Sequence, residues 1–265
     1  KGGQQESWTP KFWYHGARYL QATLIPAEGG STLPEIRSLD AAVVHSSSTP
    51  AGTFTCSNDL FNRVRTLIRW AQRANLVSVI SDCPHRERLG WLEQYHLHGP
   101  SLRYEWDMAG LYAKTLQDMA DSQTPDGLVP DIAPEYTVFS GGFRDSPEWG
   151  ASAILVPWQQ YEWTGDPSLI RRHYPTMKRY LDYLGTKADG HILFHGLGDW
   201  YDIGPGNPGE AQLTPKALTA TAIYFMCADC VAKSAGLLGN DADAAACTAL
   251  AGQIKSAFNA KFLNQ

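Results

Sequence analysis

The chain has 265 residues, which is enough for one large domain or two smaller ones. Its 22 Lys and Arg residues against 27 Asp and Glu residues give a net charge of −5, which argues against nucleic-acid binding because few phosphates could be neutralised. A content of 43% hydrophobic and 18% charged residues excludes a disordered chain and a charged coiled coil. The longest uncharged apolar run, residues 217–228, is too short to cross a bilayer, so we predict no membrane span.

Residues 1–55 have the composition of extended chain. The stretch from Phe12 to Leu24 is rich in aromatic and β-branched residues, and the polar linker Ser46–Pro50 follows two short apolar stretches. Fifty residues with few long apolar faces would not bury enough surface to fold alone. We therefore expect the end of a β-domain.

The pattern becomes helical from Ser57, which we predict to cap a helix. Its inward face would carry apolar residues at helical spacing: Leu60, Val64, Leu67, Ile68 and Ala71. Start and stop signals predict five further helices. They run from Pro100 to about Met119, from Trp149 to Gly165, from Asp166 to Gly185, from Thr214 to about Gly236, and from Asn240 or Asp241 to about Phe262.

The connections 122–148 and 189–213 are long, aromatic and rich in Gly and Pro. Irregular loops of this length are uncommon in a compact domain unless they have a function. Helices that alternate with such loops favour an α/α toroid whose loops build a central pocket.

Residues 81–99 hold the densest set of polar groups, with Asp82, Glu87 and Glu93 beside arginine, histidine and aromatic residues. Carboxylates next to Arg and Trp can form a binding site in which the pKa of one acid is shifted. They can equally form a structural ion-pair network. The histidines of this segment match no known metal spacing, so we predict no metal and no cofactor. Cys227 and Cys230 lie in an apolar run and are predicted to be buried core thiols.

Two further loops offer side chains of the same kinds. One carries Glu148 and Trp149 just before a helix, and the other carries Asp199 and Trp200. No nucleophile elbow or phosphate-binding loop is present in the sequence. Carboxylates, Arg and aromatic platforms on the loops of a toroid fit glycoside hydrolysis.

The segment DCPHRERLGW at 82–91 resembles the signature of the α-L-rhamnosidases of glycoside hydrolase family 78. Four other segments are similar to parts of the same family: 8–21, 54–64, 146–150 and 197–200. The resemblance implies a mainly α fold, with the end of a β-sandwich domain and linker at 1–50 and the first half of an (α/α)6 catalytic barrel at 51–265. It also implies a substrate that carries terminal α-L-rhamnose.

Site residues follow from the resemblance position by position. Glu87 matches the general acid of an inverting hydrolase. Residues that match sugar contacts, supports of the acid or aromatic walls are Asp82, Arg86, Trp91, Trp149, Asp199 and Trp200. Gln94, at the position of a family Asp, is predicted to bind substrate as well.

Two departures from the family pattern matter. The family usually has Gly-Asp where this chain has Glu93 and Gln94, so a carboxylate is lost at Gln94, and Glu93 and Glu148 are candidates to compensate. The family's general base lies late in the barrel, on a segment that this chain does not include. We therefore expect a piece of a longer polypeptide, with the rest of that polypeptide as its partner. The compartment stays open, with a periplasmic or secreted location as the expectation.

Two other functions stay open at this stage. A uronate lyase that cleaves a rhamnose–glucuronate bond would use a Tyr or His base and an Arg, for which Tyr95, His98 and Arg86 are the candidates. A catalytically inactive relative would bind carbohydrate through its Trp residues, since a fold does not imply an activity.

Overall fold

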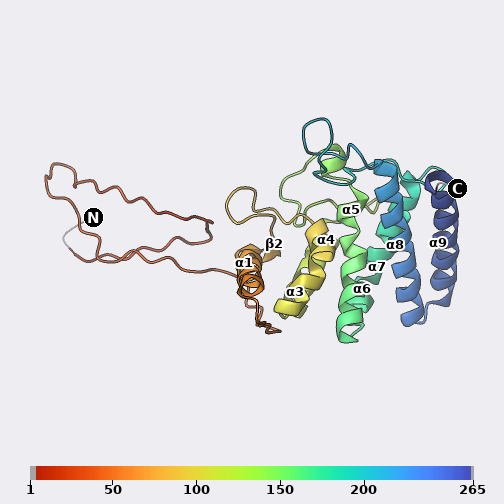
Figure 1. Cartoon of the computed structure of the whole chain (residues 1–265), viewed down its shortest axis with the longest axis horizontal. Coiled ribbons are helices and arrows are strands. Elements are labelled where there is room, and N and C mark those ends of the chain that lie inside the picture. Colours follow the sequence, from red (N-terminus) through yellow and green to blue (C-terminus); the bar gives the residue numbers. More distant parts are fainter. Residues whose placement is uncertain (1–3, 264–265) are drawn as a thin grey trace.

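The computed structural model describes residues 4–263, and its helical part follows an extended N-terminal segment. Figure 1 shows this segment as a long loop away from the helices. No strand forms within residues 4–49; the first pairing is an isolated bridge between Pro50 and Trp106. The β-strands expected before the barrel are therefore not found in these residues. A strand needs a partner along its length, and residues 4–49 make only isolated backbone hydrogen bonds to the helical part, such as the bond from the Gly16 N–H to the Pro84 carbonyl.

Helix α1 spans Asp59–Asn75, and the short antiparallel strands β1 (Leu76–Val77) and β2 (Val79–Ile80) follow it. The helix cap is Asn58, whose side chain accepts a hydrogen bond from the Leu60 N–H, so the prediction of Ser57 as the cap was wrong by one residue.

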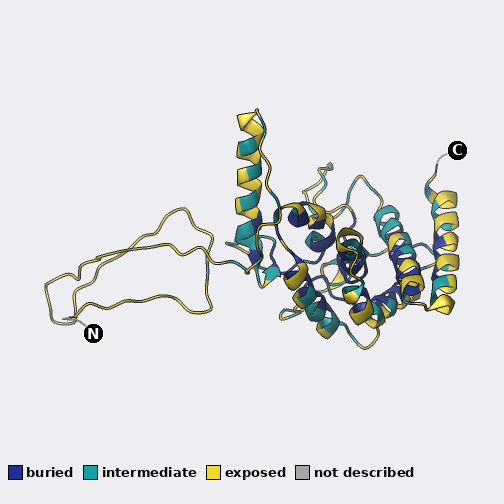
Figure 2. Cartoon of the chain, turned by 90° about the horizontal axis from the view of Figure 1, so that it is seen from below, coloured by how far each residue is buried: buried dark blue, intermediate teal, exposed yellow. Residues whose placement is uncertain are grey.

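The apolar face of α1 points outward, against our prediction. Its members are exposed: Leu60, Val64, Leu67, Ile68 and Ala71. The helix instead docks through polar side chains, because Arg65 forms an ion pair with Glu105 at 2.8 Å and Gln72 accepts a hydrogen bond from the indole of Trp106. Figure 2 shows the resulting exposed helix beside the buried centre of the molecule.

Helix α2 (Glu93–Leu97) is followed by α3 (Gly99–Glu105) and α4 (Ala109–Ser122), where we predicted one helix from Pro100 onward. The break lies at Trp106, which is extended. The chain around the linker Ser46–Pro50 hydrogen-bonds to the backbone on both sides of this break. The Asp107 N–H donates to the Thr49 carbonyl, and the Ala51 N–H donates to the Glu105 carbonyl. These backbone bonds replace those that a continuous helix would make.

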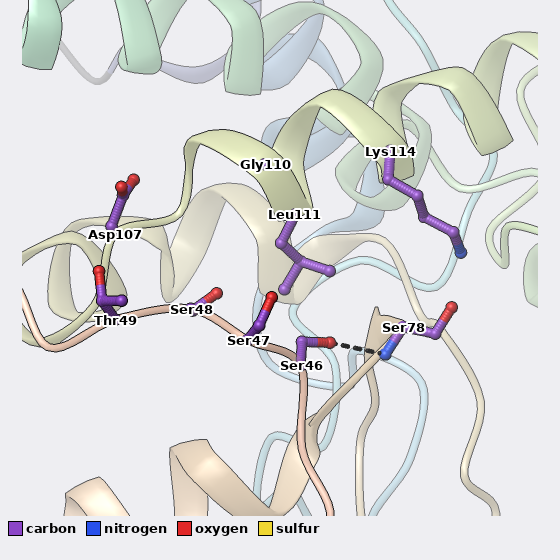
Figure 3. A pocket seen from close by; sticks show the side chains of 9 residues that line it. All are labelled: Ser46, Ser47, Ser48, Thr49, Ser78, Asp107, Gly110, Leu111 and Lys114. Atoms are coloured by element: carbon purple, nitrogen blue, oxygen red, sulfur yellow. Dashed lines mark hydrogen bonds between the residues drawn. The ribbon is translucent and has the colours of Figure 1, made fainter.

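Figure 3 shows the linker lying along the start of α4. The hydroxyl of Ser46 accepts a hydrogen bond from the Ser78 N–H at 2.9 Å, which ties the linker to the turn between β1 and β2. The serines of the linker, Asp107 and Lys114 border an open polar groove there. The linker is thus part of the helical body.

The remaining helices are α5 (Pro147–Gly150), α6 (Ser152–Thr164), α7 (Ser168–Lys187), α8 (Lys216–Leu237) and α9 (Asp241–Phe262). Gly165 ends α6 in the left-handed conformation, as predicted, whereas Gly185 lies inside α7, so the predicted helix end there was wrong. Among the described residues, no helix is long and apolar enough to cross a membrane.

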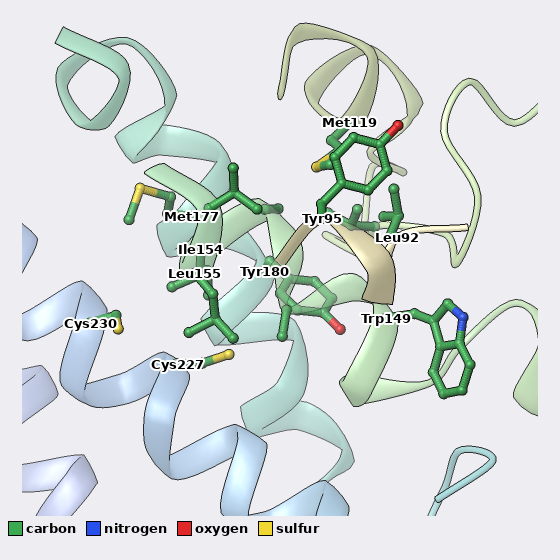
Figure 4. Close-up of a cluster of buried hydrophobic side chains, with 14 of the residues drawn as sticks. Leu92, Tyr95, Met119, Trp149, Ile154, Leu155, Met177, Tyr180, Cys227 and Cys230 are labelled. Carbon is green, nitrogen blue, oxygen red and sulfur yellow. The ribbon is translucent and has the colours of Figure 1, made fainter. Parts of the chain in front are cut away.

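The core lies between α4, α6, α7 and α8, which run side by side in Figure 1. Figure 4 shows Tyr95, Ile154, Met177 and Tyr180 packed there. Cys227 and Cys230 are buried free thiols, which confirms their assignment to the core. The long connections 123–146 and 188–215 gather at one end of the helices (Figure 1). The η1 turn (Gly141–Phe143) belongs to the first of them.

Candidate active site

The segment that carries Glu87 is an irregular loop whose two ends are tied together. The Asp82 N–H donates to the Leu89 carbonyl at 3.1 Å, and the Leu89 N–H donates back to Asp82 Oδ1 at 2.9 Å. Pro84 accepts a hydrogen bond from the Gly16 N–H at 2.9 Å, so the N-terminal segment also holds the loop. These bonds fix a stretch that Pro84 prevents from being helical throughout.

A cavity of about 330 Å³ opens beside this loop. Its lining combines carboxyl, amide and aromatic groups: Asp82, Glu87, Trp91, Glu93, Gln94, Phe143, Trp149, Leu197 and Trp200. These residues come from the Glu87 loop, the start of α2, the η1 turn, α5 and the 188–215 connection. Its volume is at the lower end of the range for small-ligand sites, as one sugar ring requires.

Glu87 lies at the exposed side of this cavity. Its Oε2 accepts a hydrogen bond of 2.9 Å from the indole Nε1–H of Trp91. Trp91 in turn stacks on Phe139, with ring centroids 5.3 Å apart. The carboxyl group is therefore held at a defined position and still faces solvent, so it can exchange a proton with a bound ligand.

Aromatic rings form much of the wall. Trp149 on α5 is 3% exposed, and its ring centroid lies 6.4 Å from that of Trp200, which is 38% exposed. Phe143 contacts Trp200 edge to face at 5.4 Å. Rings of this kind can stack on the apolar face of a sugar.

Three carboxyl groups, one in the cavity lining and two outside it, are buried. Burial raises the pKa of Glu93 to about 7, and the nearby carboxylate of Asp82 adds to the shift. Asp131 is fully buried, accepts a hydrogen bond from the Ser146 N–H at 2.9 Å, and has a pKa raised by its burial. Glu148 is also buried, accepts a hydrogen bond from the Thr219 hydroxyl at 2.7 Å and does not line the cavity.

The cavity therefore brings together most of the predicted site residues, and others lie outside its lining. Arg86 is exposed, and Asp199 accepts a hydrogen bond from the Thr214 hydroxyl at 3.3 Å. Neither lines the cavity, and their role as sugar contacts stays a prediction.

The residues proposed for lyase chemistry are also outside the lining. Tyr95 is fully buried in the core, and its hydroxyl accepts a hydrogen bond from the Ile80 N–H at 3.0 Å. His98 is exposed beyond α2, with Nε2 at 3.3 Å from the amide nitrogen of Gln72. Neither side chain lines the cavity, and both make contacts within the fold.

Three lining residues were not among the predicted sugar contacts: Glu93, Phe143 and Leu197. Glu93 carried a signal, because it stands inside the departure from the family signature. Leu197 also carried a signal, because it begins the matching segment 197–200. Phe143 reaches the cavity through the conformation of its loop, which no local pattern shows. Within the described residues, no group of three or more His, Cys, Asp or Glu side chains could hold a metal ion.

Comparison with known proteins identifies relatives of this chain. The α-L-rhamnosidase of Streptomyces avermitilis is 32% identical over 265 residues, which cover 99% of this chain and 24% of that protein. The structure of α-L-rhamnosidase from Dictyoglumus thermophilum superimposes with a TM-score of 0.79 at 33% identity, over 88% of this chain and 26% of that one. The structure of the Streptomyces avermitilis enzyme complexed with L-rhamnose gives a TM-score of 0.76 at 32% identity, over 83% of this chain and 20% of that one.

The chain spans about a quarter of the length of the curated relatives that it matches. The model of the bacterial α-L-rhamnosidase six-hairpin glycosidase domain matches residues 49–265, which include every helix described above. The domain match, the aligned relatives and the structural superpositions all point to α-L-rhamnosidases. The chain belongs to the bacterial α-L-rhamnosidase six-hairpin glycosidase family.

Proposed function

We propose that the protein is a glycoside hydrolase that removes terminal α-L-rhamnose from glycans or glycosides with inversion at the anomeric carbon. The observation that carries this proposal is one cavity that combines the Glu87 carboxyl group with three tryptophan walls. An inverting hydrolase needs an acid at the leaving oxygen and a base that activates water across the ring. Family membership and a relative described as complexed with L-rhamnose support a rhamnose-sized occupant.

In this mechanism Glu87 is the general acid. The bond from Trp91 occupies Oε2 and leaves Oε1 to carry the proton toward the glycosidic oxygen. Trp149 and Trp200 would hold the apolar face of the ring. A carboxylate from outside this chain would act as the general base and activate the water.

The remainder of a longer polypeptide is proposed as the partner that completes the barrel. The exposed apolar stripe of α1 supports this, because exposed contiguous apolar surface marks a face that is covered in the assembled protein. Under the same proposal, residues 1–50 are the end of a β-sandwich domain and residues 51–265 are the first half of the barrel.

The test uses the natural protein that contains this chain and its Glu87→Gln variant, on a glycan with terminal rhamnose linked to glucuronate. Free rhamnose and the ultraviolet absorbance of an unsaturated uronate are followed in the same sample. We expect wild type to release rhamnose without absorbance, as the β-anomer first, and Glu87→Gln to lose about 100- to 10,000-fold in kcat because the amide cannot donate the proton.

Glu162→Gln on the exposed face of α6 is the matched control and should keep full activity. Absorbance together with rhamnose would indicate elimination in place of hydrolysis. Sugar binding without either product would indicate an inactive relative. A near-normal kcat in Glu87→Gln would show that another group is the acid.

A further inference from the structure

Glu93 is a cavity residue that the proposed mechanism does not use. It begins α2 and lines the same cavity as Glu87 and Gln94. Its Oε2 is buried and has no hydrogen-bond partner among the described residues. An unpartnered buried carboxyl oxygen is costly, so a polar partner from a ligand would stabilise it.

The surroundings of Glu93 favour a protonated carboxyl group. The lining carries Asp82, Glu87 and Glu93 and, within the described residues, no Lys, Arg or His that could neutralise them. Asp82 accepts the Leu89 N–H, and Glu87 accepts the Trp91 indole N–H, whereas Oε2 of Glu93 has no donor. Like charges that share a cavity disfavour each other's ionised forms, and an oxygen without a donor stabilises the ionised form less, so both observations favour a proton on Glu93.

The groups that face Glu93 from other elements act in the same direction. Asp82 in the Glu87 loop and Asp131 in the 123–146 connection are both carboxyl groups close enough to interact with it. His96, on the same helix, has a pKa lowered to about 4 by burial and is neutral. Burial raises the pKa of Glu93 to about 7, although hydrogen bonds from its own amide and from Gln94 oppose the shift.

We propose that Glu93 is a sugar-binding residue whose protonated carboxyl group donates a hydrogen bond to a hydroxyl of the rhamnose ring. The inference rests on the proposed function and adds a substrate contact to it. It also selects between the two candidate replacements for the carboxylate missing at Gln94. Both have a buried oxygen without a partner, but Glu93 lines the cavity and Glu148 does not. At Glu93 the substrate would satisfy the oxygen that the protein leaves open.

The test compares Glu93→Gln and Glu93→Leu with wild type in the natural protein. L-Rhamnose is titrated against tryptophan fluorescence between pH 5 and pH 9, since three tryptophans line the cavity. Loss of a hydrogen bond to a buried carboxyl should weaken rhamnose binding about 10- to 100-fold in Glu93→Leu. Glu93→Gln can still donate, so its affinity at pH 6 should stay within a few-fold of wild type.

The pH profile separates a substrate contact from a structural role. Wild-type affinity should fall as pH rises through 7 and Glu93 loses its proton, whereas Glu93→Gln should give a flat profile. Glu162→Gln should keep the wild-type profile, and circular dichroism checks that each variant is folded.

Three results would overturn the inference. Glu93→Leu could bind rhamnose as tightly as wild type does, or the Gln and Leu variants could lose equal affinity at pH 6. The third is an affinity of the wild-type protein that rises above pH 7. If those results come with rhamnose release by the wild type, only the role of Glu93 is refuted. A wild type that neither binds nor releases rhamnose would refute the proposed function as well.

Discussion

Two tryptophans of the cavity should respond differently to truncation, because they are buried to different extents. Trp149 is 3% exposed and Trp200 is 38% exposed. A fully buried Trp covers about 150–250 Å², which is about 4–6 kcal/mol at 25 cal/mol per Å², and Trp→Ala substitutions in cores cost about 3–5 kcal/mol. Scaling the cost of Trp→Ala by the buried fraction of Trp200 gives a loss of about 2–3 kcal/mol in the free energy of unfolding for Trp200→Ala.

Sugar affinity should follow a different order from stability. Both rings line the cavity, so loss of either aromatic surface should weaken rhamnose binding by about tenfold, or about 1.4 kcal/mol. Trp163→Ala is the matched control, because Trp163 is 48% exposed on α6 and packs on Tyr104 outside the cavity. It should lose stability as Trp200→Ala does and keep its affinity for rhamnose.

The assay pairs urea unfolding, followed by circular dichroism, with calorimetric titration of L-rhamnose. Wild-type rhamnose affinity in Trp200→Ala, or an equal loss of affinity in Trp163→Ala, would refute a sugar contact by the Trp200 ring. Unfolding of Trp149→Ala at the wild-type urea concentration would show that burial of Trp149 contributes nothing to stability.

Two further predictions concern stability. Burial lowers the pKa of His96 to about 4, so the histidine is neutral in the folded protein and takes up a proton more readily in the unfolded chain. The free energy of unfolding should therefore fall by about 2 kcal/mol as the pH is lowered from 7 to 5. Urea midpoints should show a smaller fall over this range in His96→Asn. A Cβ on Gly150 would lie 2.2 Å from the hydroxyl oxygen of buried Tyr180, so Gly150→Ala should cost about 1–3 kcal/mol or more. Gly252→Ala, with open space on α9, should gain about 0.5–1 kcal/mol, and equal denaturation curves for the two alanine variants would contradict the packing argument.

Local signals in the sequence were sufficient for much of the helical framework. The start of α9 at Asp241, the end of α6 at Gly165 and the burial of Cys227 follow from caps, left-handed glycine and apolar periodicity, which act over a few residues. The signature at 82–91 identified the cavity loop, because its residue types are specific even without a structure.

Directions of side chains depended on tertiary structure. The stripe of α1 has the periodicity of a buried face and yet points outward, because Arg65 and Gln72 make the contacts that dock the helix. Tyr95 looked like a reactive group and is a core residue.

The sequence by itself determined most of the helical segments and which loop carries the family signature. Only the tertiary structure decided that Glu93 reaches the cavity while Glu148 does not. The physical reason is range: caps and periodicity are set by neighbours along the chain, whereas the lining of a cavity depends on how segments far apart in sequence pack together.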